Sequence, residues 1–155
     1  MPTYTPDPAV LEPIETASAD ELRALQETRL RATLRHAYES SPHYRTVFET
    51  AHLRPEDITS LDDLPTLPFT RKDDLRAGYP FGMFAVPRER IARIHASSGT
   101  TGKATVVGYT VEDLAMWASV MARSLRAAGT RPGHLLHNAY GYGLFTGGLG
   151  AQMQA

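Results

Sequence analysis

The sequence predicts an α/β fold in which a helical N-terminal region leads into the first strands of an incomplete sheet. Three observations carry this prediction. Capped amphipathic helices fill most of residues 18–90, runs of β-branched residues begin only at Ile91, and the second part of the chain is poor in charge. Only six Asp, Glu, Lys or Arg side chains lie between Ile94 and Ala155, so this part is expected to form interior.

Composition limits the class of protein. At 155 residues the chain has room for one domain, and 42% hydrophobic with 21% charged residues is typical of a globular protein. A formal net charge of -1 provides no basic field for nucleic acid. The absence of cysteine excludes disulfides, thiolate zinc sites and a cysteine nucleophile. Since the N-terminus shows no secretory signal, we expect a cytoplasmic protein.

Residues 132–155 carry no charged side chain, yet they do not predict a membrane span. Two histidines, an asparagine, two glutamines and six glycines interrupt the stretch. A transmembrane helix requires about 20 mainly apolar residues in succession.

The chain begins with a predicted arm and a long helix. Prolines keep residues 1–17 extended, because proline fixes φ and removes a backbone donor. Ser18 and Glu21 form the capping-box pattern, which predicts a helix from about Ala19 to Glu39. Its leucines recur at helical spacing, and arginines and glutamates fill the other, solvated face.

Three further helical segments complete a helical region over residues 18–90. Pro42 suits the first turn of a second helix, which is predicted to reach about Ala51. Shorter helical turns are predicted after Ser60 and from Thr70, which resembles another N-cap.

Residues 91–155 are predicted as the start of an α/β domain. Strands over Ile91–Ala96 and Thr105–Tyr109 flank a loop. Thr110 caps a long helix that ends at Gly129, and a third strand is predicted from about His134 to Ala139. Since mean sheets have about five or six strands, we expect a fragment of a longer protein.

The loop between the first two strands is the best candidate for chemistry. Small side chains let several backbone amides converge on phosphate oxygens, and a lysine at the loop end adds positive charge. We call this segment the phosphate loop; it consists of Ser97, Ser98, Gly99, Thr100, Thr101, Gly102 and Lys103. Composition alone leaves a flexible Ser/Thr/Gly hairpin loop as an equal alternative.

A Walker-type P-loop is disfavoured. Ser97 stands where that motif requires its first glycine, and Ala104 follows the lysine where it requires Ser or Thr. The predicted strand after the loop also replaces the helix N-terminus that a Walker motif needs.

Two segments resemble a known family. Residues 95–105 (HASSGTTGKAT) resemble the phosphate loop of the acyl-adenylate-forming enzymes, and residues 140–148 (YGYGLFTGG) are similar to the aryl-substrate segment of phenylacetate-CoA ligases. Residues 20–23, 34–38 and 79–87 resemble that family too. The resemblance covers nearly all of the chain, but only the N-terminal part of the family's large domain.

The resemblance implies an AMP-forming reaction. A carboxylate would attack the α-phosphate of ATP with Mg²⁺ present, and coenzyme A would then capture the acyl adenylate. The phosphate loop would handle the β- and γ-phosphates, and Tyr140, Gly141 and Phe145 would line a pocket for an aryl carboxylate such as phenylacetate. Without the family match, these residues are more simply core aromatics on a glycine-rich turn. The implied partners are these small molecules and the remainder of the parent chain, with a homodimer as one possible assembly.

The chain departs from the family pattern in two respects. Ala104 stands where the family usually has proline, which is expected to loosen the loop without abolishing phosphate binding. The adenine, ribose, magnesium and catalytic-lysine segments are missing, so the chain alone is expected to be inactive. The alternatives are a phosphate-binding NTPase-like module and a non-catalytic binding fragment.

Histidine and aromatic side chains carry weaker signals. His134 and His137 would point to opposite faces of a strand, so no metal site is predicted. His95 is expected to be a strand residue beside the phosphate loop, with a general-base role left open by its position next to that loop. Trp117 and Met121 are expected to pack in the core.

Overall fold

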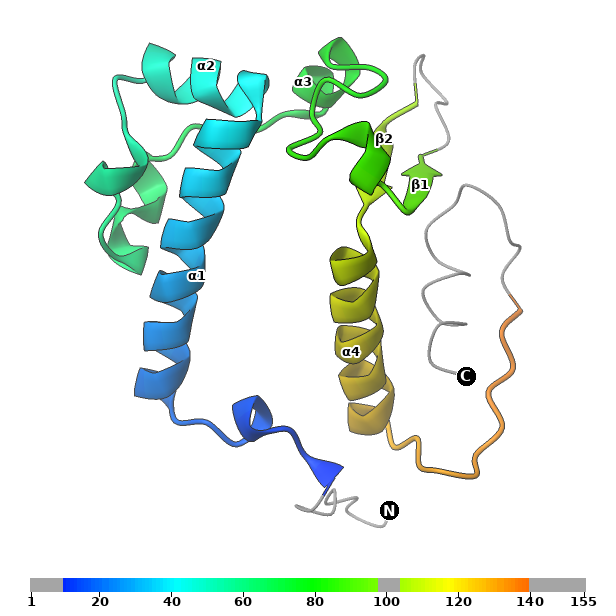
Figure 1. Ribbon diagram of the computed structural model, residues 1–155. Coiled ribbons are helices and arrows are strands. Elements are labelled where there is room, and N and C mark those ends of the chain that lie inside the picture. The colour runs from blue at the N-terminus through cyan, green and yellow to red at the C-terminus, as the bar shows by residue number, and fades with distance from the viewer. Residues whose placement is uncertain (1–9, 98–103, 140–155) are drawn as a thin grey trace.

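The computed structural model describes residues 10–97 and 104–139. Two long helices, α1 (Ala19–Ser40) and α4 (Val111–Ala127), run in opposite directions (Figure 1). The shorter helices α2 (Pro42–Thr50) and α3 (Lys72–Ala77) gather at the end where α1 finishes, together with strands β1 (Arg93–Ala96) and β2 (Val106–Tyr109). The predicted order of a helical region followed by strands is confirmed.

Helix α1 begins at the predicted capping box. The Glu21 N–H donates to the Ser18 hydroxyl at 3.3 Å, and the Ser18 N–H donates to the Glu21 carboxylate at 2.8 Å. The Ser18 N–H and then the Ser18 hydroxyl, which also donates to the Glu21 carboxylate at 2.8 Å, hold the pKa of Glu21 below its ordinary value. Because a lowered folded-state pKa stabilises the fold above that pKa, this contribution is present at neutral pH and is lost on acidification.

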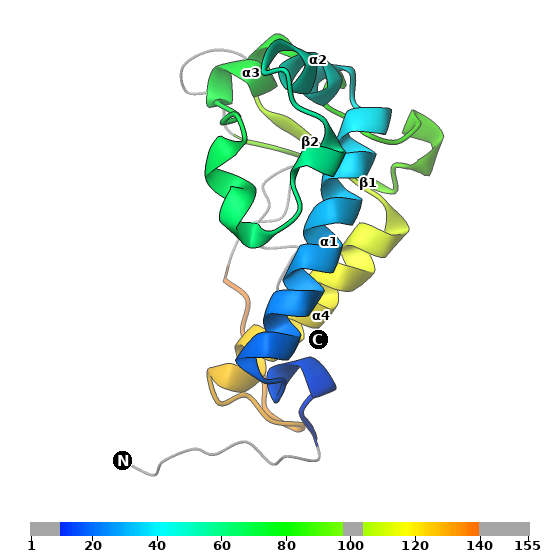
Figure 2. The same cartoon turned by 90° about the vertical axis from the view of Figure 1, so that its left-hand side faces the viewer.

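The helical region has a small core of its own. Leu34 of α1, Phe48 of α2 and Ile58 form the buried hydrophobic cluster of the described residues. Tyr38 packs edge-on against Phe48, with 5.9 Å between ring centroids. Helix α2 and the turns that follow it contact α1 (Figure 2), and the last of these turns reaches back through Asp62 to Arg23, near the start of α1. The predicted amphipathic character of α1 is confirmed by the burial of Leu34.

The two short helical segments begin with N-cap residues of different kinds. The predicted turn after Ser60 is a 3₁₀ helix, Leu61–Thr66, and the Ser60 side chain caps it. The prediction that Thr70 caps the next helix is wrong, because Arg71 is the N-cap of α3. The Arg71 N–H donates to the Asp74 carboxylate at 2.6 Å, while the Thr70 hydroxyl lies 3.2 Å from the hydroxyl of Tyr44.

Helix α4 begins and ends as predicted. The Thr110 hydroxyl accepts from the Asp113 N–H at 3.2 Å, and the Thr110 N–H donates to the Asp113 carboxylate at 2.9 Å. Gly129 has a φ of 100° and donates to the Arg126 carbonyl, while the Thr130 N–H donates to the Leu125 carbonyl. This pair of bonds is the Schellman motif, whose left-handed position favours glycine.

The described part of the predicted arm contacts α4. It contains a 3₁₀ turn, Pro13–Glu15. Arg126 pairs with Glu15 at 3.2 Å and also donates to the Val10 carbonyl, and Glu12 lies 3.8 Å from Arg123. These contacts join the start of the chain to the far end of α4 (Figure 1). Residues 1–9 lie outside the described residues.

The predicted third strand is wrong. Residues 134–139 have no regular secondary structure, and the sheet of the described residues contains only β1 and β2. A strand is stabilised by backbone hydrogen bonds to a neighbour. No described strand lies beside this segment, and the Leu135 side chain is fully exposed.

Candidate functional site

Strands β1 and β2 form an antiparallel hairpin that presents the phosphate loop. Arg93 pairs with Tyr109 at one end of the ladder and Ala96 with Val106 at the other. Beyond the ladder, the Ser97 N–H donates to the Thr105 carbonyl at 3.0 Å, and the Thr105 N–H donates to the Ser97 hydroxyl at 3.2 Å. We call this Ser97–Thr105 pair the neck of the hairpin. The predicted strand, loop and strand are confirmed at both ends of the loop.

The described residues contain only one member of the predicted phosphate-binding set. Ser97 is exposed at the neck, whereas residues 98–103 lie outside the described residues. Tyr140, Gly141 and Phe145, predicted to line the aryl pocket, also lie outside them.

An aromatic cluster fixes the hairpin to α4. His95 is 1% exposed and lies edge-on to Tyr109 and Trp117, with ring centroids 5.2 and 5.6 Å away. Tyr109 and Trp117 stack on each other at 5.2 Å. Offset and edge-on contacts are the favourable arrangements of such rings. The prediction that His95 is a strand residue is confirmed. Trp117 packs against these rings, but Trp117 and Met121 are only partly buried and do not belong to the buried core that was predicted for them.

The other face of the hairpin packs against the segment that precedes it. Gly108 of β2 faces Phe84 and Ile91 so closely that a Cβ atom there would lie 2.7 Å from the Phe84 ring and 2.9 Å from the Ile91 side chain. The absence of a side chain at Gly108 therefore lets this segment approach β2.

Replacing Gly108 by alanine is expected to destabilise the fold by about 1–3 kcal/mol, the usual cost of overpacking. Urea unfolding followed by circular dichroism would measure the change. Ile91→Val removes one of the two clashing groups, so the double variant should lose less stability than the sum of the two single variants. A Gly108→Ala variant as stable as the original chain would contradict the close packing.

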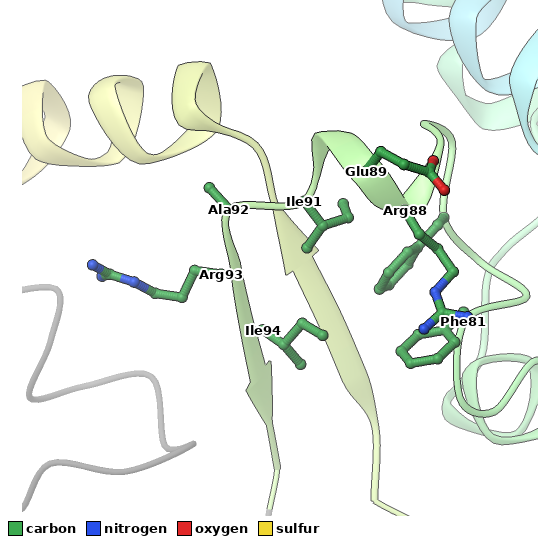
Figure 3. Close-up of a pocket in the computed structure, with 8 residues that line it drawn as sticks. Phe81, Arg88, Glu89, Ile91, Ala92, Arg93 and Ile94 are labelled. Atoms are coloured by element: carbon green, nitrogen blue, oxygen red, sulfur yellow. The ribbon is translucent and has the colours of Figure 1, made fainter.

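A cavity of about 520 Å³ lies beside β1, and the sequence did not predict it (Figure 3). Phe84, Ile91 and Ile94 provide apolar walls, and Arg88 places its guanidinium 4.5 Å from the ring centroid of Phe81. This is a cation–π contact. In the sequence, the available signal for this cavity was the spacing of Phe81, Phe84 and Arg88. That spacing can be interpreted only in the folded chain, where this segment lies beside β1.

A second cavity, of about 530 Å³, lies between the helical region and the start of α4. His36 and Tyr44 line it from one side, and Gly108 and Glu112 line it from the other. The backbone N–H of Glu112 and the Thr110 hydroxyl, followed by the charge of Arg90 at 3.2 Å, hold the pKa of Glu112 below its ordinary value. Glu112 is therefore ionised at neutral pH and is not suited to act as a general acid.

Candidate metal-ligand clusters and membrane-spanning helices are both absent among the described residues. Within residues 10–97 and 104–139, no group of three or more histidine or acidic side chains could hold a metal ion. His134 and His137 lie on an irregular segment, and His134 is instead within 3.3 Å of the Arg131 N–H. No helix in this part of the chain has both the length and the hydropathy to cross a lipid bilayer.

Solved structures with the same fold define the class of protein. A 2-hydroxyisobutyryl-CoA ligase in an open conformation, in complex with 2-HIB-AMP and CoA, matches with a TM-score of 0.82 and 32% identity over 90% of this chain and 33% of that chain. The same ligase in its thioesterification state matches with a TM-score of 0.83 and 31% identity over 95% and 34%. The fold is that of a part of an adenylate-forming CoA ligase.

Curated relatives indicate which kind of CoA ligase the chain resembles. The chain is 64% identical over 155 residues to the phenylacetate-coenzyme A ligase of Aromatoleum evansii, covering 100% of this chain and 35% of the relative. It is 61% identical over 145 residues to that of Escherichia coli K12, covering 94% and 33%. The chain spans about a third of the length of these ligases and is similar to them throughout. No protein-family model matches the chain.

Proposed function

We propose that the parent of this chain is an ATP-dependent, AMP-forming aryl-acid CoA ligase that activates phenylacetate or a similar carboxylate. The observation that carries the proposal is the hairpin. Its hydrogen-bonded neck, between Ser97 and Thr105, flanks a sequence of small residues and one lysine that resembles the phosphate loop of the adenylate-forming enzymes. The high identity to phenylacetate-coenzyme A ligases supports the choice of an aryl acid.

The proposed roles follow the predicted residues. Residues 97–103 would bind the ATP phosphates, because convergent amides and a lysine neutralise an anion. Tyr140, Gly141 and Phe145 would contact the aryl ring. Mg²⁺ would enter with the nucleotide, and coenzyme A would be the acyl acceptor. The division into an arm (residues 1–17), a helical region (18–90) and the start of the AMP-binding domain (91–155) belongs to the proposal, as do a cytoplasmic location and a homodimer.

The remainder of the parent chain is proposed as the partner of this third. Several large apolar side chains are exposed on the described residues, notably Phe69 at 91% and Leu135 at 101%. In this proposal, the remainder of the parent chain covers these side chains. A sheet of two strands also offers edges that further strands of the parent would extend.

Exchange of labelled pyrophosphate into ATP tests the proposed function. The full-length parent is expected to catalyse this exchange only when phenylacetate is added, because the acyl adenylate forms reversibly from carboxylate and ATP. The reaction without carboxylate is the control. ATP hydrolysis without any carboxylate-dependent exchange would contradict the ligase and favour an NTPase. Absence of ATP binding would favour a non-catalytic module.

A further inference from the structure

The half of α4 beyond Trp117 is not held by buried apolar side chains. Most of the stability of a helix in a protein comes from the packing of its apolar face. No residue of α4, all of which the structure describes, is buried. Helix α4 contacts the sheet through β2, and its aromatic contact is made by Trp117 in the first half of the helix. Other contacts must therefore position the far end of α4.

The chain shortly before α1 provides such contacts. We call residues 10–16 the strap; they include the 3₁₀ turn Pro13–Glu15, which lies between the start of α1 and the end of α4 (Figure 1). The Glu12 N–H donates to the Glu15 carboxylate at 2.8 Å and so closes the turn. Because residues i and i+3 of a 3₁₀ helix eclipse each other, Glu12 and Glu15 lie on the same side of the strap.

A polar stripe on α4 faces the two carboxylates. It consists of Ser119, Arg123 and Arg126, which are spaced by four and three residues and therefore share one face of the helix. The Ser119 hydroxyl donates to the Glu12 carboxylate at 3.3 Å, and Arg123 Nε lies 3.8 Å from the same carboxylate. Arg126 Nη2 lies 3.2 Å from the Glu15 carboxylate. The strap therefore matches the polar stripe in charge and in spacing.

Arg126 joins the strap to the end of α4. Its guanidinium also donates to the Val10 carbonyl, and its side chain is 19% exposed beside a Glu15 side chain that is 20% exposed. A charge withdrawn from water to this extent is costly without a partner. The Arg126 carbonyl accepts from the Gly129 N–H at 3.0 Å and from the Arg131 guanidinium at 3.1 Å. One residue thus bonds both the strap and the segment where the chain leaves α4.

We propose that residues 10–16 act as a releasable strap that holds the far end of α4 when it is docked on the polar stripe. The strap and the end of the helix form one cooperative unit, whose two parts open and close together. The docking contacts are polar and partly exposed, and they are separate from the buried cluster around Phe48. The unit can therefore open locally while the helical region stays folded. The inference goes beyond the proposed function and does not rest on it.

Hydrogen–deuterium exchange of the full-length parent, read by mass spectrometry, tests the strap through two variants. Glu15→Gln removes the negative charge but keeps an oxygen that can accept from the Glu12 N–H. Exchange in residues 10–16 and 124–131 should rise about three- to tenfold, because the bond from Arg126 is no longer charge-assisted. Arg126→Met removes every contact of the guanidinium and should raise exchange in both segments at least about tenfold.

Two controls separate release of the strap from a general loss of stability. Glu112→Gln removes the exposed ion pair with Arg90 at the start of α4, so exchange in residues 124–131 should stay within about twofold of the original rate. In all variants, peptides that contain Leu34 or Phe48 should also keep their original exchange rate within about twofold.

The double variant Glu15→Gln/Arg126→Met measures the coupling between the two side chains. It should exchange no more than about twofold faster than Arg126→Met alone, because both changes break the same contact. An acceleration equal to the product of the two single effects would show that the side chains act independently and would overturn the proposal.

Three further results would overturn the strap. These are unchanged exchange in residues 124–131 in both single variants, faster exchange in residues 10–16 alone, or an equal acceleration in the peptides of the buried cluster. The measurements need neither ATP nor phenylacetate, so they decide the role of the strap even if the proposed function fails.

Discussion

Replacement of Lys103 by methionine in the full-length parent is expected to reduce phenylacetate-dependent pyrophosphate exchange by about 10²–10³-fold. The lysine is the only cation within the phosphate loop. Charge develops on the pyrophosphate as it leaves, and a positive group that stabilises it lowers the barrier to the reaction. The loss should appear mainly in kcat and in the KM for ATP. Methionine retains most of the side-chain length, so the comparison isolates the charge.

The matched control is Lys72→Met. Lys72 is the only other lysine among the 155 residues and lies exposed in the first turn of α3. The Lys72→Met variant loses the same charge at a position distant in sequence from the phosphate loop. Its rate of pyrophosphate exchange should therefore remain within about twofold of the original rate. Equal losses in the two variants would mean that overall charge, rather than the loop lysine, governs the rate.

The largest expected change in stability is that of Phe48→Ala, about 3–5 kcal/mol in the free energy of unfolding. Phe48 is 3% exposed, packs with Leu34 and Ile58, and meets Tyr38 edge-on. Since these three apolar side chains are the buried core of the described residues, removal of the largest leaves a cavity that α1 and α2 cannot fill without moving. Urea unfolding of the chain, followed by circular dichroism, would measure the effect.

Thr50→Ala is the control for Phe48→Ala. Thr50 is exposed at the end of the same helix, so its replacement should change stability by less than about 0.5 kcal/mol. A Phe48→Ala variant within about 1 kcal/mol of the original chain would show that the helical region is not organised around this core.

Signals within a few residues of one another were predicted correctly. Ser18 with Glu21 and Thr110 with Asp113 define the starts of α1 and α4, because each side chain bonds a backbone group three residues away. Gly129 defines the end of α4 through its own φ. The flanks of the phosphate loop were equally predictable, since strand propensity changes abruptly at both ends.

Predictions that depended on a distant partner were less reliable. The segment His134–Ala139 has strand-like residues but no neighbouring strand among the described residues. Thr70 has a capping side chain, yet the tertiary fold places its hydroxyl beside Tyr44 and lets Asp74 satisfy the backbone of Arg71. Neither the missing neighbouring strand nor the contact between Thr70 and Tyr44 is encoded in the few residues around the site.

The sequence by itself determined the boundaries of α1 and α4, the hairpin and the candidate phosphate loop, because capping, turn and strand preferences act over three to seven residues. Only the tertiary structure decided that His95 is buried against Tyr109 and Trp117, that Gly108 admits Phe84, and that a cavity forms beside β1. These features depend on the packing of segments far apart in the chain. Burial therefore emerges only when the hairpin closes on α4.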